Sequence, residues 1–225
     1  MSLGVRLEKP LGFRAFEAEG YARGFKAIAG VDEVGRGPLA GPVVAAAVIL
    51  PRDYSHPEIK DSKLLSPRQR EILAPVIQQD AESWGLGVVD VGEIDRINIL
   101  QASLLAMAKA LDQLRPKPDY LLIDGNQVIA PKLFRNTQFA LNSTPYQETI
   151  VKGDRLCLSI AAASIVAKVA RDEMMVAFDK QFPQYGFAGH KGYGSAAHLE
   201  ALRRHGPSPI HRLSYKPVRD AMLRR

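Results

Sequence analysis

Four acidic side chains sit where apolar runs end, each close to a glycine: Asp32, Glu33, Asp124 and Asp154. Clustered carboxylates repel one another and lose solvation when buried, so a group of them needs cations. Ligands that are all oxygen, with no His or Cys nearby, favour Mg²⁺ or Mn²⁺ over zinc. Two such ions can activate a water and stabilise the leaving oxygen of a phosphodiester, which makes metal-dependent phosphodiester hydrolysis the predicted chemistry.

This prediction depends on the order of the strands. Each acid taken alone also fits a turn residue or a helix cap. If the three strands that end at these acids are neighbours, the carboxylates meet at one edge of the sheet. Asp32 and Glu33 point to opposite faces of a flat strand, so they share a site only if the strand twists or bends. Gly35 and Gly37 make such a bend easy.

The elements that must position these acids follow from apolar runs and helical spacing. Strands are predicted at about 27–33, 42–50, 83–89, 120–123 and 147–151. Helices are predicted at about 66–79, 91–114, 159–180, 195–204 and 217–224, with a short surface helix within 1–26. Ser66 suits an N-cap and Pro67 the first helical position. This order predicts an α/β or α+β domain with a mixed sheet flanked by helices.

Residues 35–40 also match the dinucleotide-binding pattern G-x-G-x-x-A. That pattern requires a helix to follow and present its N-terminus to a pyrophosphate. Gly41, Pro42 and the β-branched Val43 favour a strand there instead. We therefore reject a dinucleotide site.

Composition limits the remaining classes. The 225 residues carry a net charge of +6, and a pI of about 9.5 favours an anionic partner, nucleic acid first. The single cysteine, Cys157, excludes an intrachain disulfide and fits a reducing, cytoplasmic location. We see no signal peptide, and the longest apolar run, Val43 to Leu50, is too short to span a bilayer. No membrane association is expected.

The segment 32–43, Asp-Glu-Val-Gly-Arg-Gly-Pro-Leu-Ala-Gly-Pro-Val, resembles the ribonuclease HII (type 2 ribonuclease H) family. The likeness continues through 61–63, 123–125, 152–154, 159–168 with 171–172, 190–194 and 205–212. It implies a ribonuclease H-like fold over 27–182, a small helical C-terminal extension over 183–225 and a separate basic segment at 1–26. It also implies a monomer that cleaves RNA in RNA–DNA hybrids. On duplex DNA it implies incision 5′ of a single ribonucleotide, leaving a 3′-hydroxyl and a 5′-phosphate.

The resemblance assigns roles to particular residues. It makes Asp32, Glu33, Asp124 and Asp154 the catalytic acids, the first three as ligands of Mg²⁺ or Mn²⁺ and Asp154 beside the attacking water. It places substrate contacts on Gly35, Arg36, Gly37 and the junction-sensing Tyr193. Lys63, with a face of the predicted helix bearing Ser164, Lys168 and Arg171, provides candidate phosphate contacts.

Several alternatives stay open. Lys168 also lies at the right spacing to pair with Asp172. His198, His205 and His211 receive no catalytic role and are expected to pack or cap. A metal-dependent nuclease without ribose specificity and a non-catalytic nucleic-acid-binding module are the rival functions.

Overall fold

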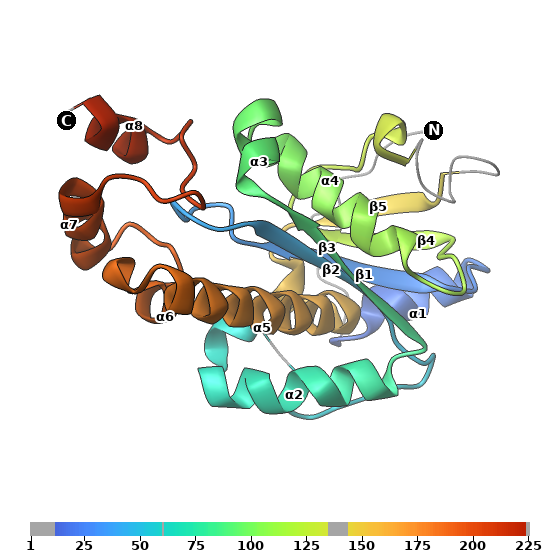
Figure 1. Ribbon diagram of the computed structural model, residues 1–225. Coiled ribbons are helices and arrows are strands. Elements are labelled where there is room, and N and C mark those ends of the chain that lie inside the picture. Colours follow the sequence, from blue (N-terminus) through green and yellow to red (C-terminus); the bar gives the residue numbers. More distant parts are fainter. Residues whose placement is uncertain (1–11, 60, 135–143, 224–225) are drawn as a thin grey trace.

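The computed structural model of the chain describes residues 12–59, 61–134 and 144–223, and is built around a five-stranded sheet between two helical layers (Figure 1). The strands are β1 Ile28–Val34, β2 Val43–Ile49, β3 Ser83–Val89, β4 Tyr120–Asp124 and β5 Tyr146–Ile150. The helices are α1 Ala15–Ala22, α2 Pro67–Asp80, α3 Val91–Ile97, α4 Ile99–Asp112, α5 Leu158–Gln181, α6 Phe187–His190, α7 Ala196–His205 and α8 Lys216–Leu223. Short 3-10 turns are η1 Ser62–Leu64, η2 Pro131–Phe134, η4 Gly153–Arg155 and η5 Pro183–Tyr185.

The sheet is mixed, with the strand order β3-β2-β1-β4-β5. β1, β2 and β3 pair antiparallel, whereas β1, β4 and β5 run parallel. The three strands that end at the acidic side chains are therefore neighbours, as the sequence argument required. Because parallel strands end at the same edge of a sheet, their carboxyl ends and the turns that follow lie together.

Each face of the sheet buries its own apolar core. α4 covers one face and packs Leu104, Met107 and Leu111 against the strands. α5 covers the other face, with α2 packed outside it (Figure 1). Ser66 forms the predicted N-cap of α2, and Gln69 completes a capping box.

α5 can lie directly against β1 because Gly30 has no side chain to keep the helix and the strand apart. A Cβ on Gly30 would lie 2.1 Å from the carbonyl carbon of Ser159, and one on Gly35 would lie 2.3 Å from Arg171 Nε. From Ser159 to Arg171 a helix rises about 18 Å, and from Gly30 to Gly35 a strand rises about 16 Å. The helix and the strand therefore run in the same direction and cover nearly the same length between these two contacts.

The single helix predicted over 91–114 is wrong, because the chain forms two helices there. Asn98 separates α3 from α4 with φ 68° and ψ 164°, and its side chain accepts a hydrogen bond from the Gln101 backbone N–H. Asparagine tolerates positive φ better than most residues and caps well. The apolar spacing continues across the break because both helices pack on the same side of the sheet.

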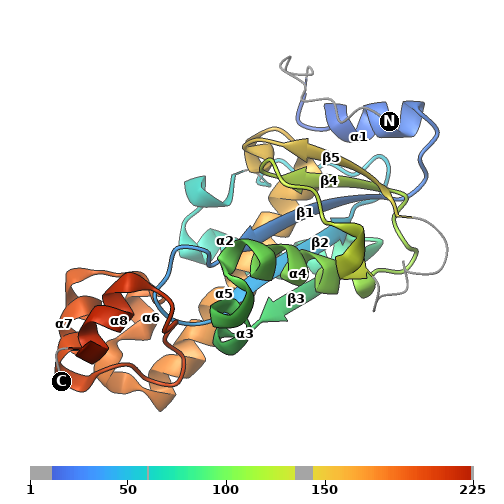
Figure 2. The same cartoon turned by 90° about the horizontal axis from the view of Figure 1, so that it is seen from above.

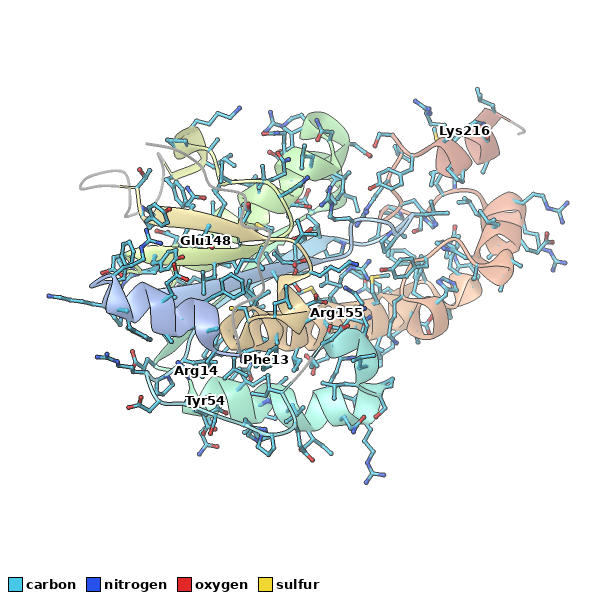
Figure 3. All side chains as sticks on the ribbon, turned by 180° about the vertical axis from the view of Figure 1, so that it is seen from behind. Phe13, Arg14, Tyr54, Glu148, Arg155 and Lys216 are labelled. Carbon is cyan, nitrogen blue, oxygen red and sulfur yellow. The ribbon has the colours of Figure 1, made fainter. Side chains whose placement is uncertain are left out.

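The helix predicted in the N-terminal segment is α1, and it has a buried face. Phe16 packs against β4, and Glu17 is buried at the start of α5. Glu17 Oε1 accepts a hydrogen bond from the Ser159 backbone N–H over 2.8 Å. Arg14, just before α1, donates to backbone carbonyls of Pro51 and Tyr54 (Figure 3).

The C-terminal helices α6, α7 and α8 gather beyond the end of β1 (Figure 2). They pack around Leu39 and Ala40, which belong to the loop after β1. Backbone hydrogen bonds join the loop to this region, from Leu39 N–H to Gly192 O and from Gly41 N–H to Ile210 O. Within the described ranges, no helix is long and apolar enough to cross a membrane.

Candidate active site

Three aspartates lie at the carboxyl ends of the parallel strands. Val31 of β1 pairs with Ile123 of β4, so Asp32 and Asp124 follow at corresponding positions on neighbouring strands. Asp154 lies in the turn after β5. The Gly153 backbone N–H donates to Asp124 Oδ1 over 2.7 Å, which ties that turn to the end of β4.

Glu33 lies on the opposite face of β1 from Asp32. Asp32 pairs with Ala46, which packs in the core under α5, whereas Glu33 pairs with Ala45, which packs under α4. Regular pairing with β2 continues through Val34, so no bulge brings the two carboxylates onto one face. Arg36 Nη1 instead lies 3.2 Å from Glu33 Oε1.

The pKa values show that these acids repel one another at the sheet edge. Burial raises the pKa of Asp32 well above the ordinary range, and the charges of Glu33 and Asp124 raise it further. Burial raises the pKa of Glu33, against the opposing effect of Arg36. Burial also raises the pKa of Asp124, although the Gly153 N–H opposes the rise. Ionising these acids together is unfavourable unless a cation compensates them.

Basic side chains of the protein compensate part of this charge. Lys63 Nζ lies 2.9 Å from Asp154 Oδ2, and that hydrogen bond raises the pKa of Lys63. Across the described residues, no three Asp, Glu, His or Cys side chains are close enough to form a ready-made metal site. The available donors are carboxylate oxygens on neighbouring strand ends, which is the chemistry that Mg²⁺ and Mn²⁺ prefer. By donor type, these carboxylates therefore suit a hard divalent cation.

Residues 61–63 bring further polar groups to the same place. Ser62 Oγ lies 2.8 Å from Ser164 Oγ, and a hydrogen bond from Ser164 lowers the pKa of Asp32. Arg155 Nε lies 2.8 Å from Asp61 Oδ2, so the turn that holds Asp154 meets this loop through two ion pairs. Ser164 and Lys63 both lie beside the predicted catalytic acids.

The loop after β1 is held by two fully buried arginines. Arg171 donates to the carbonyls of Pro42, Ala40 and Lys191. Arg212 donates to the carbonyls of Gly35, Arg36 and Gly41. Burial lowers the pKa of Arg171 to about 10, which leaves it charged at neutral pH. The prediction that Arg171 contacts phosphate is wrong, because its guanidinium is buried against backbone carbonyls.

Tyr193 lies beside the loop in space. A Cβ on Gly37 would lie 3.5 Å from Tyr193 Cε1, and the Tyr193 side chain remains 48% exposed. Gly35 requires φ +98°, which favours glycine at that position. The structure therefore brings Gly35, Arg36, Gly37 and Tyr193 together at the end of β1, next to the carboxylates.

Lys168 forms the alternative contact allowed by its spacing. Its Nζ lies 2.6 Å from Asp172 Oδ1, and burial lowers the pKa of Lys168. Lys168 also lines a groove with Arg70 and Lys191, between α2, α5 and α6. The groove carries Glu71 and Glu173 as well, so its charges are mixed.

Comparison with known proteins identifies the family. Residues 29–218 match the family model described as Ribonuclease HII. Ribonuclease HII of Syntrophus aciditrophicus is 54% identical over 206 residues, covering 92% of each chain. The crystal structure of ribonuclease H2 from Pyrococcus horikoshii superposes with a TM-score of 0.71 at 29% identity, covering 88% of this chain and 98% of that one.

The chain belongs to the ribonuclease HII family. Its fold is ribonuclease H-like, and a further likeness of fold joins it to Bst-RNase HIII in complex with Mn²⁺, at a TM-score of 0.68 and 23% identity over 88% of this chain and 71% of that one. As a member of this family, the protein is a ribonuclease H of type 2, an endonuclease that hydrolyses RNA in RNA–DNA hybrids.

Sequence reasoning missed several residues that organise this ribonuclease HII site. Arg212, Ser62 and Glu17 form buried hydrogen bonds that no local pattern predicts, because their partners lie far away in sequence. The family likeness over 61–63 and 205–212 includes Ser62 and Arg212, but it does not indicate these contacts. Glu17 lies outside these segments.

Proposed function

We propose that this ribonuclease HII is a divalent-metal-dependent enzyme that incises duplex DNA on the 5′ side of an embedded ribonucleotide. The products are a 3′-hydroxyl and a 5′-phosphate, and the protein works as a monomer in the cytoplasm. The observation that carries the proposal is that the Tyr193 ring lies 3.5 Å from where a side chain on Gly37 would begin, in the loop that follows Asp32 and Glu33. This arrangement supports a surface that recognises a sugar beside the proposed hydrolytic centre.

Asp32, Glu33 and Asp124 are the proposed metal ligands. Glu33 leaves β1 on the other face, so we propose that its carboxylate reaches the ions around the end of the strand, where its charge already acts on Asp32. The pKa values of the three acids are raised by burial, so a divalent cation would relieve the cost of ionising them together. When bound, two Mg²⁺ or Mn²⁺ ions would supply an activated water and stabilisation of the leaving oxygen. Asp154, buried beside this centre, would orient the attacking water through its carboxylate.

Gly35, Arg36 and Gly37 are the proposed readers of the 2′-hydroxyl, which is the group that distinguishes RNA from DNA. Without a Cβ, the backbone at Gly37 can approach the sugar closely. Arg171 and Arg212 hold the carbonyls of this loop from beneath, which fixes its shape before substrate arrives. The Tyr193 ring would then stack on the following deoxyribose, where an added hydroxyl would clash.

Lys63, Ser164 and Lys168 are the proposed phosphate contacts. Lys63 has a largely exposed side chain and reaches the acids from the solvent side. Ser164 is buried beside Asp32, so a phosphate oxygen would have to approach its hydroxyl closely. Lys168 would bind a phosphate of the nucleic-acid backbone in the neighbouring groove, and its ion pair with Asp172 would weaken.

The test uses a DNA duplex with one ribonucleotide, incubated with Mg²⁺ or Mn²⁺ beside an all-DNA duplex of the same sequence. We expect incision 5′ of the ribonucleotide alone, lost in Asp124→Asn and retained in the control Asp220→Asn, whose side chain pairs with Lys216 on α8. Cutting of both duplexes would contradict the ribose-reading roles of Gly35–Gly37 and Tyr193. Binding in EDTA without cleavage in either metal would favour a non-catalytic binding module.

A further inference from the structure

Tyr193 is held through its backbone by residues that have no part in the proposed chemistry. Its N–H donates to the carbonyl of His190 over 2.9 Å. Its carbonyl accepts from the Ser195 N–H, and His198 Nδ1 lies 2.8 Å from the same oxygen. The ring of His198 therefore helps to set the position of the tyrosine beside Gly37.

His198 is in turn held by His211. The two Nε2 atoms lie 3.0 Å apart, and the Ser208 backbone N–H donates to His211 Nδ1 over 2.9 Å. A nitrogen that accepts a hydrogen bond carries no proton, so a neutral His211 carries its proton on Nε2. His211 Nε2–H then donates to His198 Nε2, which leaves the proton of His198 on Nδ1. That Nδ1–H points at the Tyr193 carbonyl.

This arrangement requires both rings to be neutral. If His198 gained a proton, two N–H groups would face each other across the Nε2 contact. If His211 gained one, its Nδ1–H would face the Ser208 backbone N–H. Both rings are buried, and burial lowers the pKa of His198 and lowers that of His211 to about 4. The groups that face the pair are His190 stacked on His198, and Tyr185 and Phe187 beside His211, with no carboxylate among these contacts.

The same segment also holds the other half of the sugar-recognition surface. His211 lies opposite Ala40 in a short antiparallel bridge. The next residue, Arg212, donates from its side chain to the carbonyls of Gly35 and Arg36. Two consecutive residues thus hold the glycine loop directly and Tyr193 through one intervening ring.

We propose that His211 is a positioning residue for sugar discrimination, and that it fixes Tyr193 relative to the Gly35–Gly37 loop through the single proton arrangement of the His211–His198 pair. The proposal rests on the proposed function, because it assumes that Tyr193 reads the deoxyribose after the ribonucleotide. His211 touches neither substrate nor metal and acts only through His198 and Tyr193.

The test compares two substrates that differ in that sugar, a DNA duplex with one ribonucleotide and a uniform RNA–DNA hybrid. His211→Leu removes the donor to His198, and we expect kcat/KM on the first substrate to fall roughly tenfold to a hundredfold, the scale of a displaced recognition group. Cleavage of the hybrid should fall by less than about threefold, because its following sugar is a ribose, which gains nothing from stacking on Tyr193.

A variant and a double variant sharpen the comparison. His211→Gln keeps an N–H donor toward His198, and we expect it to retain most of the activity on the single ribonucleotide. Tyr193→Ala should show the same substrate dependence as His211→Leu, and combining the two should cause no further loss if both act through one position. Nitrogen-15 NMR of the intact protein should show His198 protonated at Nδ1 and His211 at Nε2.

Equal losses on both substrates in His211→Leu, or His198 protonated at Nε2, would overturn the positioning role alone. Wild-type protein that cuts the hybrid but not the single-ribonucleotide duplex would overturn the proposed incision activity, and this inference with it. The two failures are therefore distinguished by the wild-type control.

Discussion

Lys63 Nζ lies 2.9 Å from Asp154 Oδ2, and this ion pair joins an exposed cation to a buried anion. The side chain of Lys63 is 71% exposed, whereas that of Asp154 is 2% exposed. The two residues come from separate loops, and the neighbouring Asp61–Arg155 pair joins the same loops. Lys63 can exchange Asp154 for water or a phosphate with little loss of free energy, because its side chain is largely exposed. The buried Asp154 carboxylate then needs another partner for its charge.

Lys63→Met should destabilise the metal-free protein. In EDTA, we expect the free energy of unfolding in urea to fall by about 1 kcal/mol, a low value for a buried charge left unpaired because Lys63 is largely exposed. Lys216→Met is the matched control, since Lys216 pairs with the exposed Asp220 on α8, away from Arg155 and the sheet (Figure 3). Equal effects of the two substitutions would contradict a special role for the Lys63 pair.

Asp32→Asn should stabilise the protein in EDTA at pH 7. Burial raises the pKa of Asp32, so the folded chain holds that proton to a higher pH than the unfolded chain and loses stability as the pH rises through the raised pKa. Asparagine removes this cost. We expect the thermal midpoint to rise by a few degrees, since about 1 kcal/mol shifts a chain of this size by roughly 2–4 °C.

The same variant should lose its response to metal. Adding Mn²⁺ should raise the midpoint of wild type and of Asp220→Asn, but not that of Asp32→Asn. A lower midpoint for Asp32→Asn than for wild type in EDTA would show that the Asp32 carboxylate is compensated within the protein alone.

His211 should make stability fall in mild acid. Its folded pKa is about 4, below the ordinary value of 6.5, so the unfolded chain takes up a proton at a higher pH than the folded chain does. The contribution to stability is complete above pH 6.5 and is lost toward pH 4, on the order of 3 kcal/mol, and His198 acts in the same direction.

Urea unfolding at pH 7.5, 6 and 5 checks this dependence. We expect His211→Gln to flatten the slope and His205→Gln, at the exposed end of α7, to leave it unchanged. A wild-type slope that His211→Gln does not alter would assign the effect to other groups.

Gly30→Ala should be severely destabilising. The new methyl would meet the backbone of Ser159 and Ile160 at 2.1 and 2.3 Å, and backbone cannot rotate away as a side chain can. We expect a loss of at least about 3 kcal/mol in urea unfolding. Gly189→Ala, where a Cβ meets nothing within 4 Å, should change stability by less than about 0.5 kcal/mol. A mild Gly30→Ala would mean that α5 can move off the sheet.

Much of the fold could be predicted from local pattern. β3 was predicted at Ser83–Val89 because its apolar run is bounded by turn residues, and the N-cap of α2 followed from Ser66 and Pro67. The break at Asn98 could not be predicted. Apolar periodicity indicates which face of a helix is buried, but not the backbone angles of a residue between two helices. The structure confirms the strand order on which convergence of the acids depended, which the sequence could only assume.

Sequence reasoning predicted the acidic residues of the site but missed the buried side chains that hold the loop beside them. Strand-end acids next to glycines are a local pattern, and the family resemblance added Tyr193 and the glycine loop. Arg171 was interpreted wrongly, because helical spacing places it on the same face as Lys168 but does not show that Ala40 and Pro42 cover it. Such burial depends on contacts between distant segments.

α5 meets β1 at Gly30, Asp32 and Gly35 in succession, through Ser159, Ser164 and Arg171. One continuous helix therefore fixes the spacing between the acidic centre and the sugar-reading loop. Deleting a single residue between Ser164 and Arg171 would turn the rest of the helix by about 100° and carry Arg171 away from the Pro42 carbonyl. Along this stretch, a substitution changes one side chain, whereas an insertion or deletion changes the spacing between the acidic centre and the loop, so the length of the helix is itself part of the site.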